Sequence, residues 1–282
     1  MRFVFVNSRL SRFLLARSVF GISLLTTLGF FSLPESRGGT DWPSTLTDDS
    51  RGNFPDPRTV HATYVYGWSG INAATSEAYF HRGEPQTFVL EGKAHTVGLA
   101  RILWKFDLSY RSVVNAQTLR PLETHQIETA RGKRVETSLK FSSTGVSGTR
   151  MEGNRATPTV KDVALENLND LHSVFLYLRS QPLRDHSVYR VAVYPANSTY
   201  VATVTVLGRE HLRVRPGNYN AIKMDLKLQR VNKKNELEPH RKFKRATIWL
   251  SDDNDRVLLR IESQIFVGTV TAELQSIRFE ND

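Results

Sequence analysis

The chain has 282 residues, a formal net charge of +10 and no cysteine. The lack of cysteine excludes a disulfide framework, a thiolate metal site, a cysteine nucleophile and a lipoprotein anchor on an acylated cysteine. The basic residues are spread along the chain rather than gathered in one block. Removing residues 1–38, which hold five arginines and one glutamate, leaves a net charge of +6.

The first 34 residues have the layout of an export signal. Four arginines and no acidic residue precede the apolar run 18–33, and Pro34 closes the run. A membrane-spanning helix needs about 20 residues, so this run is short for a span. We expect residues 1–38 to be a signal peptide or a signal anchor, with membrane association through residues 18–33 in the second case. The expected location is the periplasm or cell envelope. An exported protein rarely meets nucleic acid, so the basic charge favours anionic glycans or lipid headgroups as partners.

Residues 39–59 are rich in Gly, Pro, Ser, Thr and Asp, which predicts a flexible linker. Residues 60–282 predict a single β-rich domain. Alternating or β-branched apolar patterns predict strands at 104–111, 199–207, 222–229, 259–265 and 266–274. Turn-forming residues separate such runs at 131–133, 195–197, 216–218 and 251–255.

Residues 167–179 have helical spacing instead. The apolar residues that recur on one face are Leu168, Leu171, Val174, Phe175 and Leu178. Asn167 or Asn169 is predicted to cap the start, and Pro182 to stop the helix. A sheet with one dry face must close or be covered. The predicted fold is therefore mainly β: an antiparallel β-roll or open barrel, with this one amphipathic helix on its concave side or across one mouth.

The order of several segments resembles one bacterial family. These segments are 64–80, 171–183, 206–228, 248–262 and 268–277. Together they resemble the exported envelope proteins catalogued as domain of unknown function 3108, over roughly residues 60–279. The resemblance implies a predominantly β exported protein, and it supplies no catalytic residue or cofactor.

Five residues are candidates for ligand binding: Trp249, Asp252, Glu210, Tyr219 and Trp68. Trp249 alternates with Ile248 and Leu250, which predicts a ring that points away from their core and is exposed beside an acidic turn. Glu210 and Tyr219 flank the Pro216-Gly217 turn, and Trp68 is a further candidate for stacking on sugar rings. The acidic turn 252–255 has the spacing of a calcium site, but ordinary Asx-turn chemistry is favoured.

Catalytic motifs are absent from the sequence. The eight histidines form no H-x-H or H-E-x-x-H pair, and there is no G-x-S-x-G, P-loop or G-x-G-x-x-G. No metal or cofactor is predicted, and His172 is expected to be a capped or half-buried histidine. The basic cluster 240–245 is interpreted as a solvated loop rather than a phosphate grip. Carboxylates in or near strands leave a glycosidase-type pair open: Glu77, Asp107, Glu210, Asp225 and Glu262.

These observations favour a non-enzymatic envelope protein that holds a lipid, a glycan or an envelope partner in the cavity of the roll, gated by the 168–180 helix. One alternative is a polysaccharide-active enzyme of the glycoside hydrolase type that uses the strand carboxylates. The other is a structural envelope protein without a ligand.

Overall fold

The structure is a computed structural model that describes residues 41–48, 50–68, 70–153, 163–196, 198–240, 243–265 and 268–280. The predicted export signal, residues 1–38 with the apolar run 18–33, lies outside the described residues.

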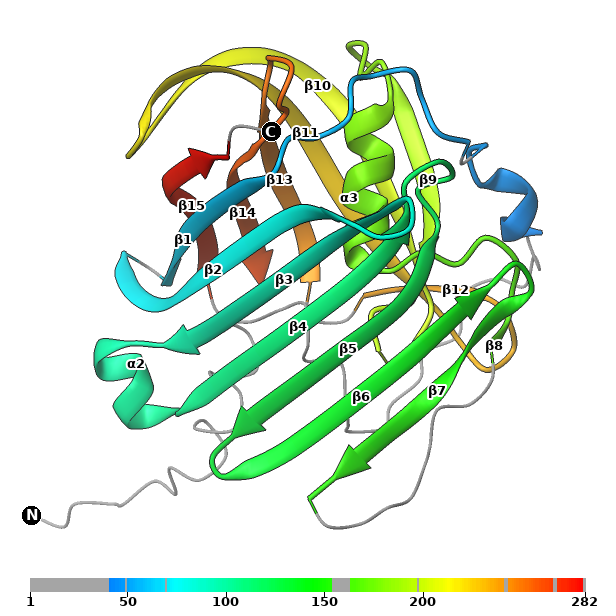
Figure 1. Cartoon of the computed structure of the whole chain (residues 1–282), viewed down its shortest axis with the longest axis horizontal. Helices are drawn as coiled ribbons and strands as arrows, with labels where there is room; N and C mark the ends of the chain where they lie inside the picture. The colour runs from blue at the N-terminus through cyan, green and yellow to red at the C-terminus, as the bar shows by residue number, and fades with distance from the viewer. Residues whose placement is uncertain are drawn as a thin grey trace, which may run out of the picture.

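One antiparallel sheet of 15 strands makes up most of the described chain and curls around a helix (Figure 1). Its first half comprises β1 (Val60–Trp68), β2 (Ile71–Gly83), β3 (Thr87–Thr96), β4 (Phe106–Asn115), β5 (Pro121–Ala130), β6 (Lys133–Ser142), β7 (Gly145–Glu152) and β8 (Val163–Ala164). Its second half comprises β9 (Val188–Val193), β10 (Tyr200–Val214), β11 (Gly217–Val231), β12 (Leu237–Pro239), β13 (Phe243–Ser251), β14 (Leu258–Ile265) and β15 (Gly268–Phe279).

The strand order is β8-β7-β6-β5-β4-β3-β2-β1-β15-β14-β13-β11-β10-β9, with β12 paired to β11. Because β8 and β9 end this order without pairing, the sheet is an open roll rather than a closed barrel. The antiparallel β-roll expected from the sequence is thus confirmed.

Alternation along each strand decides which residues face inward. In β4, Phe106 and Val114 are buried on the concave face, while Ser109 and Arg111 are exposed on the other. The strand predicted at 104–111 begins two residues later than expected, because a short helix, α2 (Gly98–Leu103), ends just before Trp104. The strand predicted at 199–207 lies within β10 except for Thr199, and the other predicted strands lie within β11, β14 and β15 over their described residues.

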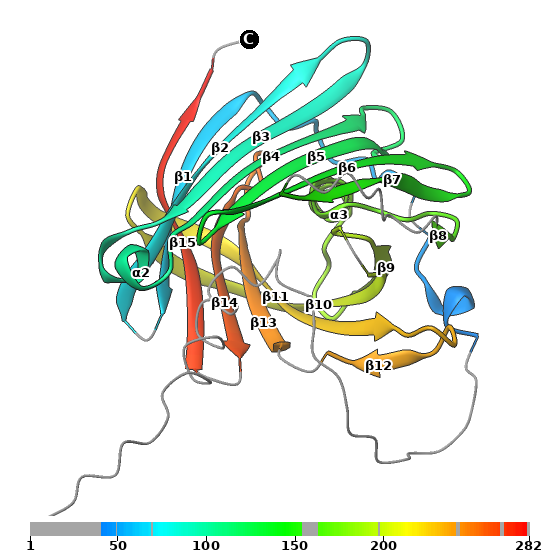
Figure 2. The same cartoon turned by 90° about the horizontal axis from the view of Figure 1, so that it is seen from below.

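The predicted helix is α3 (Leu171–Ser180), and it packs on the concave side of the roll (Figure 2). Leu176 packs with Phe88 of β3, while Tyr177 packs with Tyr189 of β9, so the helix contacts both halves of the sheet. The capping prediction was wrong: Asp170 caps the helix, and Ser173 completes a capping box. Asp170 outcompetes the two asparagines because its carboxylate directly precedes the first helical residue.

Residues 41–58, which we call the strap, differ from the flexible linker that was expected. The strap begins with a 3-10 helix, η1 (Trp42–Thr45), and Trp42 is only 1% exposed. Thr47 exchanges hydrogen bonds with Arg190 of β9: its N–H donates to the carbonyl oxygen at 2.9 Å, and its Oγ1 accepts from the N–H at 2.8 Å. The strap therefore covers part of the β9 edge. None of the helices in the described part of the chain has the length and apolarity that crossing a membrane requires.

The long β10–β11 hairpin bends over one end of β13, β14 and β15 (Figure 1). The bend coincides with a register shift after Val206, where Gly208 has a φ of 145°. Only glycine adopts this conformation without strain. Beyond the bend, Leu212 of the hairpin packs against Trp249 and Leu274.

Candidate functional site

The concave face carries apolar side chains that are only half buried. They pack against the core formed by α3, β9 and β10 while keeping part of their surface open. These residues, which we call the apolar lining, are Leu171, Val174 and Phe175 of α3, Leu226 and Leu228 of β11, and Ile248 of β13. A surface of this kind suits an apolar ligand, because every methylene it buries contributes about 0.8 kcal/mol.

A buried polar network fixes the start of α3 against β4. Asp170 accepts three hydrogen bonds: from the Ser173 N–H at 2.6 Å, from Ser112 Oγ at 2.5 Å and from Tyr110 Oη at 3.2 Å. Because Ser112 donates its only proton to Asp170, the Nδ1 of His172 must be the donor in its 3.2 Å contact with Ser112 Oγ. We call these five residues the N-terminal network.

Burial dominates the electrostatics of the N-terminal network. Desolvation raises the pKa of Asp170 more than its hydrogen bonds lower it. Burial lowers the pKa of His172 to about 3, so its ring is neutral at pH 7. Its Nε2 is buried and has no hydrogen-bond partner among the residues that the structure describes.

The arrangement does not suit nucleophilic catalysis. In a catalytic triad the histidine lies between the serine and the acid, whereas here Ser112 lies between Asp170 and His172. The Ser112 side chain is also fully buried, so no substrate reaches it in this conformation. The chemistry of the network is therefore that of an anchor for α3.

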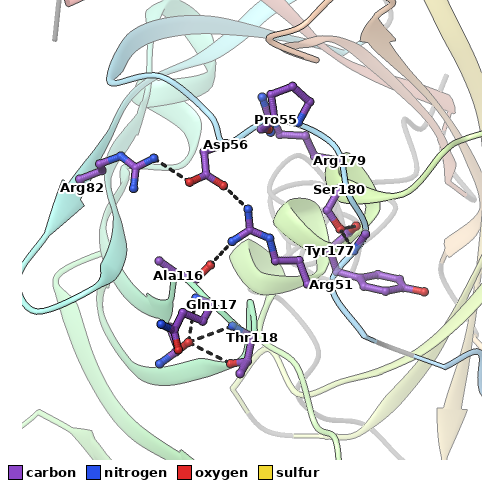
Figure 3. Close-up of polar contacts among 12 residues, drawn as sticks. Arg51, Pro55, Asp56, Arg82, Ala116, Gln117, Thr118, Tyr177, Arg179 and Ser180 are labelled. Carbon is purple, nitrogen blue, oxygen red and sulfur yellow. Dashed lines mark hydrogen bonds and ion pairs between the residues drawn. The ribbon is translucent and has the colours of Figure 1, made fainter.

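The other end of α3 is held by arginines (Figure 3). Arg179 is 2% exposed and donates to the carbonyl oxygens of Asp255 and Asn254, each at 2.9 Å, and to that of Pro55. Burial lowers the pKa of Arg179 to about 10, which leaves it charged at neutral pH. Arg256 donates to the Arg179 carbonyl oxygen at 2.6 Å.

The strap closes over this end of the helix. Arg51 binds both the Ala116 carbonyl oxygen and Asp56, and Asp56 pairs with Arg82 at 2.7 Å (Figure 3). The two arginines lower the pKa of Asp56 although burial opposes them. The space left between the strap and Arg179 is about 10 Å³, room for one water at most. The strap and this end of the helix are thus closely packed.

A larger groove, of about 450 Å³, lies between η1 and β8. Leu46 and Leu165 line it together with Glu166 and Asn167. It is open to solvent and mixes polar with apolar groups.

Glu210 and Trp249 from the predicted site do lie together. The Trp249 Nε1–H donates to Glu210 Oε1 at 2.6 Å, and Lys223 Nζ donates to Glu210 Oε2 at 3.0 Å. The hydrogen bond from Trp249 is the main cause of the lowered pKa of Glu210. The predicted exposure of Trp249 is wrong: the side chain is 5% exposed. It does point away from the core of Leu250, but the bent β10–β11 hairpin covers it.

The remaining predicted residues separate into two places. Tyr219 packs in the same cluster as Trp249, and Asp252 lies 3.5 Å from the Nε of Arg209, the neighbour of Glu210. Trp68 lies at the far end of β1, where it pairs with Ile71, and does not join this group. Their roles as ligand contacts stay predictions.

The acidic turn has the structure of an Asx turn, as favoured. Asp253 Oδ1 accepts from the N–H groups of Asp255 and Arg256, both at 3.0 Å, while Asp255 pairs with Arg58 at 2.6 Å. Within the described residues no group of three histidine or acidic side chains is placed to hold a metal ion.

Three of the strand carboxylates proposed for a hydrolase have arginine partners. Asp107 pairs with Arg101 at 2.9 Å and Asp225 with Arg245 at 2.7 Å. Glu262 lies 3.9 Å from Arg260. Glu77 is exposed on the outer face, and the pKa of Glu210 is lowered rather than raised as a general acid requires. The basic cluster 240–245 lies partly outside the described residues.

Sequence reasoning missed the N-terminal network, although a signal was present. Ser112 occupies a position of β4 whose neighbours on the same face, such as Val114 and Phe106, are apolar. A serine on a dry face predicts a buried hydrogen-bond partner. The prediction named Asn167 or Asn169 as the cap of the helix, so Asp170 was not identified as that partner.

Comparisons with known proteins agree on the fold. The family model described as "Protein of unknown function (DUF3108)" matches residues 62–275. A β-barrel-like protein of the DUF1849 family from Brucella abortus is similar in structure at 9% identity, with a TM-score of 0.58 over 81% of this chain and 100% of that one.

Two weaker structural matches are a predicted exported protein from Bacteroides fragilis and a predicted lipoprotein from Parabacteroides distasonis. The first has 10% identity and a TM-score of 0.32, over 81% of this chain and 99% of that one. The second has 9% identity and a TM-score of 0.34, over 82% of this chain and 100% of that one. Among curated proteins, none matches this sequence.

Proposed function

The chain belongs to the DUF3108 family, and for this member we propose a non-enzymatic binding protein of the cell envelope that holds the apolar chain of a lipid against its concave face. Export rests on the arginine-rich start and the apolar run 18–33. Binding rests on the apolar lining.

The apolar lining carries the proposal because its residues come from both the helix and the sheet. Val174 and Phe175 on α3 and Leu228 on β11 contact one core cluster, and none of them is fully buried. Apolar area left open on the inside of a roll is unfavourable in water, at about 25 cal/mol for each Å². An acyl chain lying between α3 and the sheet would remove that area from water, which supports a lipid as the ligand.

A separate apolar cluster lies on the sheet near α2. Half-buried Tyr66, Leu108 and Ala130 pack there against buried Phe106 and Ala94. An acyl chain is long and narrow, so a face of this kind suits it better than a bulky glycan.

Two observations weigh against a polysaccharide-active enzyme. Asp107 and Asp225 are bound by arginines, and the pKa of Glu210 is lowered. Trp249, the proposed stacking platform, is buried under the hairpin. A glycan site built from these residues would need the β10–β11 hairpin to move.

Titration of the exported protein with a fluorescent fatty acid tests the proposal. We expect saturable binding that is weakened at least about tenfold when Phe175→Gln and Leu228→Gln place two amides in the apolar lining. The matched control is Val188→Gln, an equally drastic change at a residue that is 49% exposed on β9, and it should bind like the unaltered protein. Equal binding by all three proteins, with folding verified by circular dichroism, would refute a site on the concave face.

A further inference from the structure

The large apolar side chains with the highest exposed fractions lie at one rim of the roll. On α2, Leu99 is 66% exposed, Ile102 81% and Leu103 74%, and Ile71 at the start of β2 is 55% exposed. α2 contacts β2, and the Val97 N–H donates to the Ala73 carbonyl oxygen at 2.9 Å, so these residues share one surface. A run of exposed apolar residues on a short helix is unusual on a monomeric soluble protein and marks an interaction site.

Basic residues border this surface. The Arg131 N–H, in the β5–β6 turn, donates to the Lys105 carbonyl oxygen at 3.0 Å, which places that turn beside the end of α2 (Figure 1). The Arg131 guanidinium carbon lies 3.9 Å from the centre of the Trp104 ring. Lys133, the first residue of β6, follows this turn and is exposed, as is Lys105.

Cations outnumber carboxylates here. Residues 98–107 and 130–136 contain five basic side chains but only Asp107 and Glu136 as acids. Both acids are engaged, by Arg101 and Arg134 respectively, each at 2.9 Å. Lys105 and Lys133 make no ion pair within the described part of the chain, so the surface as a whole is positive.

Apolar side chains that project beyond a border of cations complement the surface of an anionic bilayer. The apolar residues enter the boundary between headgroups and acyl chains, while lysine and arginine meet the phosphates. We propose that the rim formed by Ile71, α2 and the β5–β6 turn docks on membranes that contain anionic phospholipid. A protein partner with an apolar groove is the outcome that the following test separates from this one.

The chain contains no cysteine, so one introduced cysteine reports on one place in the full-length protein. We would attach an environment-sensitive fluorophore at Ile102→Cys and add vesicles of phosphatidylcholine with or without phosphatidylglycerol. Docking predicts a blue shift and quenching by spin-labelled acyl chains when phosphatidylglycerol is present. A label at Val188→Cys, an exposed apolar position in β9 on the other side of the molecule (Figure 1), should show neither.

The Val188 control also removes the contribution of residues 18–33. Insertion of that run alone would bring the whole protein to vesicles without favouring position 102 over position 188. Charge reversal by Lys105→Glu with Lys133→Glu should weaken the response at position 102 at least about tenfold. A response that is absent, equal at the two positions, or independent of phosphatidylglycerol would overturn the proposal.

Membrane docking at this rim is independent of the proposed lipid binding on the concave face. The charge-reversed variant keeps the apolar lining and should bind the fluorescent fatty acid normally. Loss of membrane docking with retained fatty-acid binding would therefore separate the two proposals.

Discussion

The buried ring of His172 should make the free energy of unfolding fall as the pH is lowered. Its pKa is lowered to about 3 in the folded protein because the ring is buried, against about 6.5 in an unfolded chain. Because the pKa is depressed in the folded protein, the folded state favours the neutral form of the ring. Its contribution to stability is full above the unfolded pKa and is lost as the pH falls from about 6.5 toward the folded pKa.

The magnitude follows from linkage. Lowering the pH from 7.5 to 5 should reduce the free energy of unfolding by about 2 kcal/mol through this one residue. The ring of the folded protein stays neutral down to pH 5, so the loss over this range comes from protonation of the ring in the unfolded chain. Asp170 acts in the opposite direction, since its pKa is raised and its protonation at low pH favours the folded state.

A comparison of variants isolates the histidine. Urea unfolding followed by tryptophan fluorescence would be measured at both pH values for the unaltered protein and for His172→Gln, which cannot take up a proton. We expect the loss between pH 7.5 and pH 5 to be about 2 kcal/mol smaller in the variant, whatever its stability at pH 7.5. Equal losses in the two proteins would refute the reasoning that burial holds this ring neutral.

Substitutions at three further residues test the anchoring of α3 and the hairpin. Asp170→Ala should cost about 3 kcal/mol in urea unfolding, because the helix loses its cap and Ser112 loses its acceptor, whereas Asp170→Asn should cost less than half as much. Arg179→Met should cost about 2–4 kcal/mol by leaving three carbonyl oxygens without their donor, and a cost below about 1 kcal/mol would contradict the buried contacts. Trp249→Phe should cost about 1–2 kcal/mol and raise the pKa of Glu210 toward its ordinary value, measured by NMR titration, with fatty-acid binding unchanged.

Local patterns in the sequence predict most of the fold. Period-two alternation in segments such as 222–229 depends only on which face of a strand is dry, and the structure places that segment in β11. The apolar stripe of 167–179 likewise predicts α3, because helical spacing is a property of neighbouring residues. Placement of α3 on the concave side follows from the need to cover a curled apolar face.

Features that depend on contacts between residues far apart in the chain could not be predicted from the sequence. Trp249 alternates as predicted, but it is buried by a hairpin that bends at Gly208 and whose Glu210, the partner of the Trp249 ring, lies 39 residues earlier. The strap has the composition of a linker, and only Trp42 among its residues hinted at a buried site. The helix α2 is only six residues long, too short for its apolar residues to give a periodic signal in the sequence.

Native mass spectrometry of the exported protein tests the central claim most directly. We predict a co-purifying mass in the lipid range that is retained in Val188→Gln and lost in the Phe175→Gln, Leu228→Gln double variant. A clean unliganded mass for the unaltered protein, together with no binding of added phospholipid, would contradict a lipid site on the concave face.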